Sequence, residues 1–218
     1  MISDNLENLL AELPSGVKLV AVSKFHPLGE LLEAYAMGQR CFGENRPQEF
    51  AFKAVQMPQD VEWHFIGHLQ TNKLKLVLPY AYIVESIDSI HLLEAVNAWG
   101  ERKNKVINVL LEVHIGAEET KQGFAPEEVL ELLEGGNSYP YVNFCGLMGM
   151  ASHTDDEERI GEDFACIKTL FDTCRERFPR LRDFTQLSIG MSDDWRIAIR
   201  HGSTEVRIGT AIFGPRQY

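Results

Sequence analysis

The chain alternates short apolar segments with amphipathic segments of helical periodicity along almost its whole length. A short apolar run bounded by turn residues indicates a buried strand, and apolar residues that recur every three or four positions indicate a helix. Strands that alternate with helices form parallel sheets, because a helical crossover returns the chain to the same end of the sheet. The strand pattern occurs at 18–23, 41–43, 63–67, 82–85, 106–115, 142–148, 184–189 and 205–208.

Helical patterns occupy the segments between these strands. They cover 27–37, 46–57, 72–77, 89–103, 126–134, 155–178 and 193–200. Eight strands with intervening helices predict a closed (β/α)8 TIM barrel of the α/β class, and an open doubly wound sheet is the alternative. We predict one domain over residues 1–218, because no linker or low-complexity segment divides the chain and single barrels commonly reach this length.

The charge of the chain restricts its partners. A formal net charge of −11 without a Lys/Arg-rich run argues against nucleic acids and anionic membranes. No apolar run approaches the roughly 18 residues of a membrane-spanning helix, and the acidic N-terminus lacks the basic segment of a signal peptide. We therefore expect a cytoplasmic protein, and a monomer because no extended apolar patch is evident.

The cysteines and histidines give no metal-binding pattern. Cys41, Cys145, Cys166 and Cys174 include no CxxC pair, which favours reduced core thiols over disulfides or a zinc site. His64 and His68 have HxxxH spacing but lie on a strand and its following loop, so they do not share a helical face. We expect no metal.

The C-terminal part of the chain pairs two glycine-containing loops, 188–192 and 209–210, with Arg207 on a predicted strand. Backbone N–H groups at the start of a helix attract anions. In (β/α)8 barrels, phosphate is often held by the loops after the seventh and eighth strands, where these two loops fall. The pattern predicts a phosphate site. The alternative is that the glycines only form tight turns and Arg207 pairs with a surface carboxylate.

Lys24 directly follows the first predicted strand, at the end of the barrel where functional groups gather. An amine partly removed from water there has a lowered pKa and can attack a carbonyl group; the alternative is a side chain that extends into solvent. A lysine, a phosphate cradle and an arginine together suggest pyridoxal 5′-phosphate (PLP) bound as a Schiff base. Arg207 facing the pyridine nitrogen would keep that nitrogen unprotonated and limit carbanion chemistry.

Several motifs match one known family, in order and over nearly the whole chain: AVSK at 21–24, FGEN at 42–45, WHFIGHLQTNK at 63–73, GLM at 146–148, LSIGMSDD at 187–194 and GSTEVRIGTAIFG at 202–214. With these motifs the sequence resembles the YggS/PROSC proteins, the pyridoxal phosphate homeostasis family. His68 stands where many relatives have proline, so we assign it no inherited role.

The resemblance implies a fold like the barrel domain of alanine racemase and a cofactor site at named positions. Lys24 would form the Schiff base with PLP, and Arg207 would contact the pyridine nitrogen. The other implied cofactor-binding residues are Asn45, near the cofactor, and Gly190, Met191, Ser192, Gly209 and Thr210, around the phosphate.

The resemblance also implies a carrier or regulator of PLP, with apo PLP-dependent enzymes as partners and without catalytic residues. Alanine racemase takes its second acid/base tyrosine from an additional domain, for which we expect no room before Tyr218. The alternative is a weak amino-acid racemase that uses Lys24 and a water or histidine. The loop 116–124, with Glu119 and Lys121, is a candidate lid over the cofactor; solvated surface charge is the alternative there.

Overall fold

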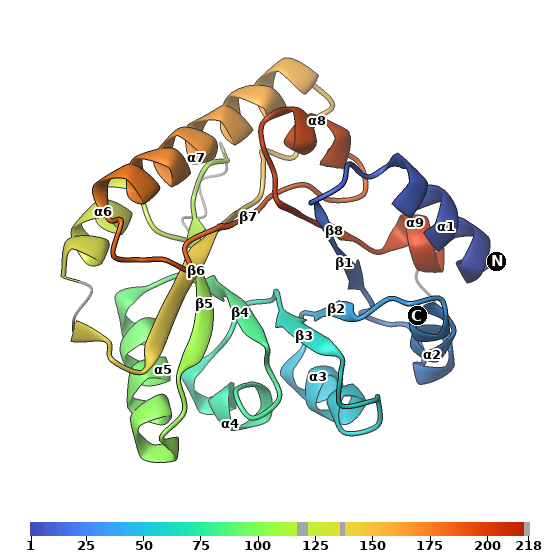
Figure 1. Cartoon of the computed structure of the whole chain (residues 1–218), viewed down its shortest axis with the longest axis horizontal. Helices are drawn as coiled ribbons and strands as arrows, with labels where there is room; N and C mark the ends of the chain where they lie inside the picture. The colour runs from blue at the N-terminus through green and yellow to red at the C-terminus, as the bar shows by residue number, and fades with distance from the viewer. Residues whose placement is uncertain (117–121, 136–137, 216–218) are drawn as a thin grey trace.

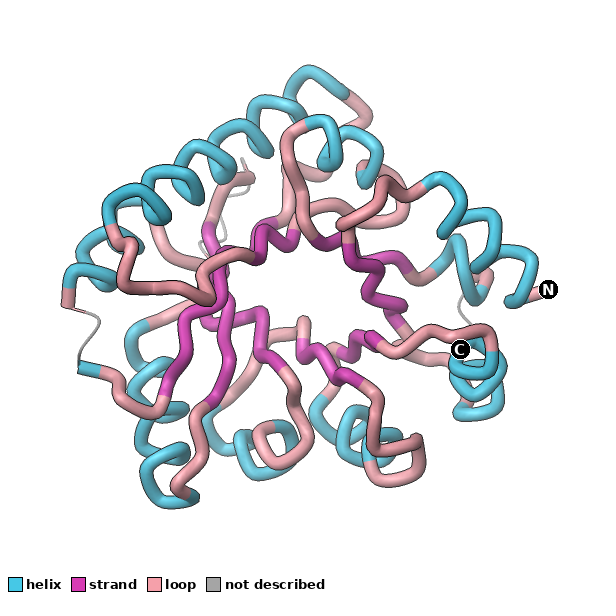
Figure 2. Tube along the Cα trace, viewed as in Figure 1, coloured by secondary structure: helices cyan, strands magenta, loops and turns pink. Residues whose placement is uncertain are grey.

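The computed structural model describes residues 1–116, 122–135 and 138–215. Within them, eight parallel strands form a closed barrel in which each strand pairs with the next and β8 pairs with β1 (Figures 1 and 2). The closure confirms the predicted (β/α)8 barrel, because an open sheet would leave two unpaired edges. The strands are β1 Lys18–Val22, β2 Cys41–Glu44, β3 Glu62–Phe65, β4 Ile83–Ile87, β5 Ile107–Val113, β6 Val142–Gly149, β7 Gln186–Ser188 and β8 Glu205–Ile208.

The helices surround the ring of strands, as Figure 2 shows. They are α1 Ile2–Glu12, α2 Leu28–Ala36, α3 Pro47–Ala54, α4 Leu74–Val77 after the 3-10 turn η1 Thr71–Lys73, α5 Ile90–Lys103, α6 Pro126–Glu134, α7 Glu157–Arg177, α8 Trp195–Arg200 and α9 Thr210–Phe213. Sequence analysis missed α1 and α9. The four residues of α9 are too few to show a helical period. The two helices meet where Asn5 Nδ2 donates to the Ile212 carbonyl at 3.0 Å.

The main core lies between the barrel and the helices. Successive strand residues face opposite sides, so one set packs outward against the helices. On β3 this set is Trp63 and Phe65, and the Phe50 ring of α3 lies 5.6 Å from each of their ring centroids. The outer surface of the barrel is therefore sealed by apolar side chains, which leaves the inward-facing residues available for other roles.

The inside of the barrel has an apolar part and a polar part. Ile83, Leu110, Cys145 and Met148, from β4, β5 and β6, form a small buried apolar cluster. Barrel interiors are usually filled by branched apolar side chains. Here the strands also contribute buried polar residues, among them His64, Glu85, Ser188, Glu205 and Arg207. This polar content indicates that the interior does more than fill space.

All four cysteines are unpaired thiols, as the sequence predicts. Burial raises the pKa of Cys145 to about 11 and that of Cys174 to about 12, so both are inert core residues. The core assignment is wrong for the other two, because Cys166 is exposed and Cys41 is only half-buried. Among the residues that the structure describes, no helix is long and apolar enough to span a membrane.

Candidate functional site

A pocket of about 480 Å³ opens where the strands end at their carboxyl side. It gathers seven of the eight cofactor-binding residues predicted from the sequence: Lys24, Asn45, Met191, Ser192, Arg207, Gly209 and Thr210. These residues follow β1, β2, β7 and β8 or lie on β8, so closure of the barrel brings them together. A volume of this size is typical of small-molecule sites.

Gly190, the eighth predicted residue, is not among the residues that line the pocket. Its φ is +98°, and a Cβ atom there would lie 2.6 Å from the Cβ of Ala198. Its carbonyl accepts the Arg207 backbone N–H at 2.9 Å. Gly190 therefore shapes the turn after β7 and ties it to β8.

The backbone on both sides of Lys24 is held by α3. Lys53 Nζ donates to the Ser23 carbonyl at 2.7 Å, and Glu49 Oε1 accepts the Phe25 backbone N–H at 2.8 Å. Phe25 has a φ of 68°, which costs energy for a residue with a side chain and persists only where its surroundings impose it. The two contacts fix the place from which the Lys24 side chain starts.

Lys53 also belongs to a buried ion pair that sequence analysis missed. Its Nζ lies 2.6 Å from Glu44 Oε1 and 2.8 Å from Glu49 Oε1, and Ser23 Oγ donates to Glu44 Oε1 at 2.7 Å. Burial raises the pKa of Glu44, and the Lys53 ammonium opposes that rise. The sequence did contain a sign of this ion pair. Lys53 lies four residues after Glu49, on the side of α3 that carries Phe50.

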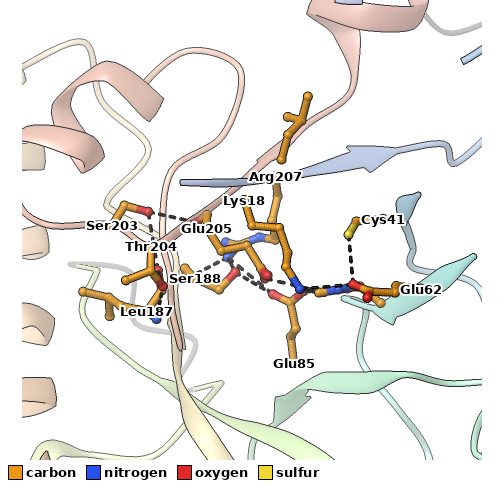
Figure 3. A network of polar contacts seen from close by, with 12 residues as sticks. Lys18, Cys41, Glu62, Glu85, Leu187, Ser188, Ser203, Thr204, Glu205 and Arg207 are labelled. Carbon is orange, nitrogen blue, oxygen red and sulfur yellow. Dashed lines mark hydrogen bonds and ion pairs between the residues drawn. The ribbon is translucent and has the colours of Figure 1, made fainter. Parts of the chain in front are cut away.

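Arg207 is 4% exposed and is oriented by contacts inside the barrel. Its Nη1 donates to the Ser188 carbonyl at 2.7 Å and to Ser188 Oγ at 2.6 Å, and its Nη2 donates to the Gly149 carbonyl at 3.0 Å. Its carboxylate neighbour is the buried Glu85, with Nη1 3.8 Å from Oε2 (Figure 3). Arg207 therefore does not pair with a surface carboxylate, and its guanidinium is fixed at the pocket floor before any ligand arrives.

Below Arg207 the hydrogen bonds continue through the interior. Ser188 Oγ donates to Glu85 Oε2 at 2.6 Å, and Glu85 Oε1 lies 2.7 Å from His64 Nδ1. We call Arg207, Ser188, Glu85 and His64 the polar column. Burial would raise the pKa of Glu85, but the bond and charge of His64 and the charge of Arg207 lower it overall. Burial would likewise lower the pKa of His64, but Glu205 and its other neighbours hold it well above its usual value.

The remaining predicted residues contribute in different ways. Asn45 Oδ1 is buried without a hydrogen-bond partner in the described part of the chain, so it is an acceptor open to a ligand. A Cβ on Gly209 would lie 2.8 Å from the Val22 carbonyl, so only glycine lets β8 end this close to β1. The Met191 N–H is already bound by Asp194 Oδ1 at 2.5 Å.

That bond gives Asp194 a role in the loop after β7. The helical pattern predicted over 193–200 would place Asp193 and Asp194 in its first turn, but α8 begins at Trp195. Asp194 stands at the N-cap position without a side-chain bond to the helix and instead closes the loop back to Met191. Met191 and Asp194 are close in sequence, so the sequence permits Asp194 either to cap the helix or to bind the Met191 N–H. The backbone path of the loop decides between these two contacts.

The pocket has further lining residues that sequence analysis did not assign to the cofactor: His26, His68, Glu112, Gln122, Met150, His153 and Asp193. Glu112 is the most informative, because burial and the charge of Asp88 raise its pKa to about 7 despite Arg207 and His68. The sequence could have indicated Glu112, because it is a charged residue inside the apolar run of β5. Glu112 and His153 also line a neighbouring cavity of about 530 Å³. The candidate lid residues Glu119 and Lys121 lie outside the described residues.

Comparison with known proteins identifies the family. The family of the alanine racemase N-terminal domain matches residues 1–217. Proteins named pyridoxal phosphate homeostasis protein from Pasteurella multocida and Schizosaccharomyces pombe are 40% and 41% identical to the chain. These matches cover 94% and 92% of this chain and 88% and 84% of the relatives. The chain belongs to the pyridoxal phosphate homeostasis protein family.

Two solved structures of one protein resemble the barrel closely. PipY of Synechococcus elongatus without PLP is 34% identical and has a TM-score of 0.93, over 98% of this chain and 100% of that chain. PipY with PLP bound is 33% identical, with a TM-score of 0.89 over the same shares. The likeness to PipY therefore extends over nearly the whole barrel.

Lys53→Met should lower the free energy of unfolding by about 3–5 kcal/mol, because it leaves the buried Glu44 carboxylate without its cation. The double variant Glu44→Gln/Lys53→Met should lose less, since it removes both charges. Urea denaturation measures both values, with the exposed Lys75→Met as control. If the unfolding free energy of Lys53→Met lay within about 0.5 kcal/mol of that of the unmodified protein, the buried ion pair would be contradicted.

Glu112→Gln should make stability less dependent on pH. Because the folded pKa of about 7 exceeds the usual 4.5, the folded state binds the proton more tightly, and stability is lost as the pH rises from about 4.5 to 7. The variant should therefore be more stable than the unmodified protein at pH 8 by about 1–3 kcal/mol, with a smaller difference at pH 5. Urea denaturation at the two pH values tests this, and Glu127→Gln on the exposed face of α6 is the control.

Proposed function

We propose that this chain binds pyridoxal 5′-phosphate in the pocket at the carboxyl ends of the strands and carries or buffers it for other enzymes, without turnover of its own. The observation that carries the proposal is that Lys24, Ser192, Thr210 and the buried Arg207 line one pocket. The names of its relatives and the PipY structure with PLP bound support the same function.

The chemistry of the pocket fits this cofactor. PLP carries an aldehyde, a hydroxyl, a phosphate and a pyridine nitrogen. The pocket offers an amine at Lys24 and hydroxyls at Ser192 and Thr210. It also offers a buried acceptor, Asn45 Oδ1, that has no donor among the described residues. When bound, the cofactor supplies a carbonyl for reversible attachment to amines and a ring that accepts electrons.

Two residues of the chain set what the site does. We assign Lys24 to covalent retention of the cofactor, with its backbone fixed by Lys53 and Glu49. We assign Arg207 to the pyridine nitrogen. A guanidinium donates hydrogen bonds but does not give up its proton, so it would leave that nitrogen unprotonated and the ring a weaker electron acceptor. This pairing favours holding PLP over carbanion chemistry.

We further propose that residues 1–218 act as one domain, in the cytoplasm and as a monomer, with apo PLP-dependent enzymes as recipients. The continuous closure from β1 to β8 supports a single folding unit. The excess negative charge of −11 supports partners other than nucleic acids.

Weak amino-acid racemization is the second candidate, and one observation favours it. The cavity of about 530 Å³ adjoins the cofactor pocket, and both are lined by Glu112, His153 and Asp193, which are possible acid/base groups beside Lys24. No tyrosine lines either cavity in the part of the chain that the structure describes. The carrier proposal therefore has the stronger support.

Borohydride treatment followed by peptide mass mapping tests the assignment of Lys24. The protein loaded with PLP should be yellow, lose this colour on reduction, and carry the added mass on the peptide that contains Lys24. Lys24→Ala should carry no reduced adduct, whereas the exposed Lys103→Ala should behave like the unmodified protein. A reduced adduct that persists at another lysine in Lys24→Ala would contradict the assignment.

Exchange of the amino-acid α-proton in deuterated solvent separates the two functions. A carrier should show no PLP-dependent exchange above that of free PLP across a panel of amino acids, because its ring is a weak electron acceptor. Exchange that depends on the protein, measured by proton NMR and abolished in His153→Gln, would favour the racemase.

A further inference from the structure

The end of the barrel opposite the cofactor pocket gathers three metal-ligand side chains that the proposed function does not use. Cys41 of β2 and Glu62 of β3 are register partners at the starts of their strands, and His64 follows two positions later on β3. One ligand atom from each of the three lies within 4.8 Å of the others. Cys41 Sγ donates to Glu62 Oε2 at 3.1 Å, as Figure 3 shows.

The histidine ring is already oriented for a ligand. Glu85 Oε1 lies 2.7 Å from His64 Nδ1, and a carboxylate only accepts, so Nδ1 carries the proton. The ring is 0% exposed, yet Nε2 has no hydrogen-bond partner in the ranges that the structure describes. A buried polar atom without a partner is rare and costly. A carboxylate that holds the far nitrogen of the ring is also the arrangement typical of metal-ligating histidines.

Beside His64 lie carboxylate oxygens without hydrogen-bond partners among the described residues. Glu205 is 1% exposed, and neither of its carboxylate oxygens has a hydrogen-bond partner among the described residues. Its Oε1 lies 3.5 Å from His64 Nδ1. The Lys18 ammonium is paired with Glu62, with Nζ 3.1 Å from Oε2. Burial raises the pKa of Glu205, although the charge of His64 opposes that rise. The cluster therefore contains carboxylate oxygens that its hydrogen bonds leave unsatisfied, and a bound cation would pair with them.

The cluster is accessible from the amino-terminal end of the barrel. The side chains of Glu62 and Lys18 are 37% and 34% exposed, and Cys41 is half-buried. An ion can therefore enter from solvent and keep a water molecule as a further ligand. The ends of the polar column thus differ, because Arg207 faces the cofactor pocket and His64 faces this opening.

We propose that this end of the barrel binds one borderline-soft divalent cation of the zinc type, through Cys41 Sγ, a Glu62 carboxylate oxygen and His64 Nε2. Thiolate, imidazole and carboxylate together suit Zn²⁺ and not Mg²⁺ or Ca²⁺, which prefer oxygen ligands alone. Tetrahedral coordination places ligand atoms roughly 3.3–3.8 Å apart, so side-chain rotations suffice from the present separations. Binding releases two protons to solvent, one from the Cys41 thiol and one from Nε2 of the His64 imidazolium. The Lys18 ammonium leaves Glu62.

An alternative set of ligands, His64, Glu85 and Glu205, also lies within 4.8 Å. It would use Nδ1, which Glu85 already holds at 2.7 Å, and would contain no thiolate. The first set leaves that hydrogen bond intact and uses the open nitrogen. We therefore assign Glu85 to orienting His64 and not to the metal.

Cobalt substitution of the full-length protein tests the ligand set. Titration with Co²⁺ should produce a thiolate-to-cobalt charge-transfer band that saturates at one ion per chain and disappears on addition of Zn²⁺. Cys41→Ser should lose the band and weaken Zn²⁺ affinity at least about tenfold, since even outer partners of a metal site contribute this much. Cys166→Ser, at an exposed position of α7, should retain both the band and the affinity.

Two further variants keep the outcome interpretable. Glu62→Gln alters a partly exposed side chain, should keep the circular dichroism spectrum of the fold, and should weaken Zn²⁺ binding to a similar extent. Lys24→Ala removes the proposed PLP attachment point but should bind Co²⁺ normally, so failure of one proposal is distinguishable from failure of the other. No band in the unmodified protein, or an unchanged band in Cys41→Ser, would overturn the metal site.

Discussion

The fixed position of Arg207 is the constraint on which the rest of the interior depends. A guanidinium enclosed in a barrel must satisfy its N–H groups, because an unpaired buried charge is costly. Ser188 and the Gly149 carbonyl supply the acceptors, and Glu85 supplies the compensating charge. Glu85 in turn needs a donor for its second oxygen, which His64 provides. One buried cation thus requires a column of polar residues through the barrel.

A second group of buried charges acts from outside the strands. Lys53 reaches from α3 to the Ser23 carbonyl, and Glu49 binds the Phe25 N–H, so helix packing is transmitted to the backbone around Lys24. The two buried networks hold an amine and a guanidinium in one pocket, after or on two strands that pair with each other. Both are prepared before a ligand binds, which is the geometry expected of a site that retains its ligand.

The sequence was most informative where local pattern and chemistry agree. Lys24 and Arg207 were predicted because a charged residue at or near the end of an apolar strand is unusual in packing terms, and both do line one pocket. Met191 shows the limit of that reasoning, since its amide is bound by Asp194 although the loop resembles a phosphate cradle. Cys41 was assigned to the core from its apolar neighbours, but it lies half-buried beside Glu62.

The sequence by itself determined the alternation of strands and helices, and hence the barrel and the end at which its functional residues lie. It could do so because strand and helix periodicities are local properties of the chain. Only the tertiary structure decided the partners inside the barrel. Ser188 and Glu85 are 103 positions apart, and their contact depends on the stagger at which eight strands close. That stagger follows from the packing of all strands together, and no single segment encodes it.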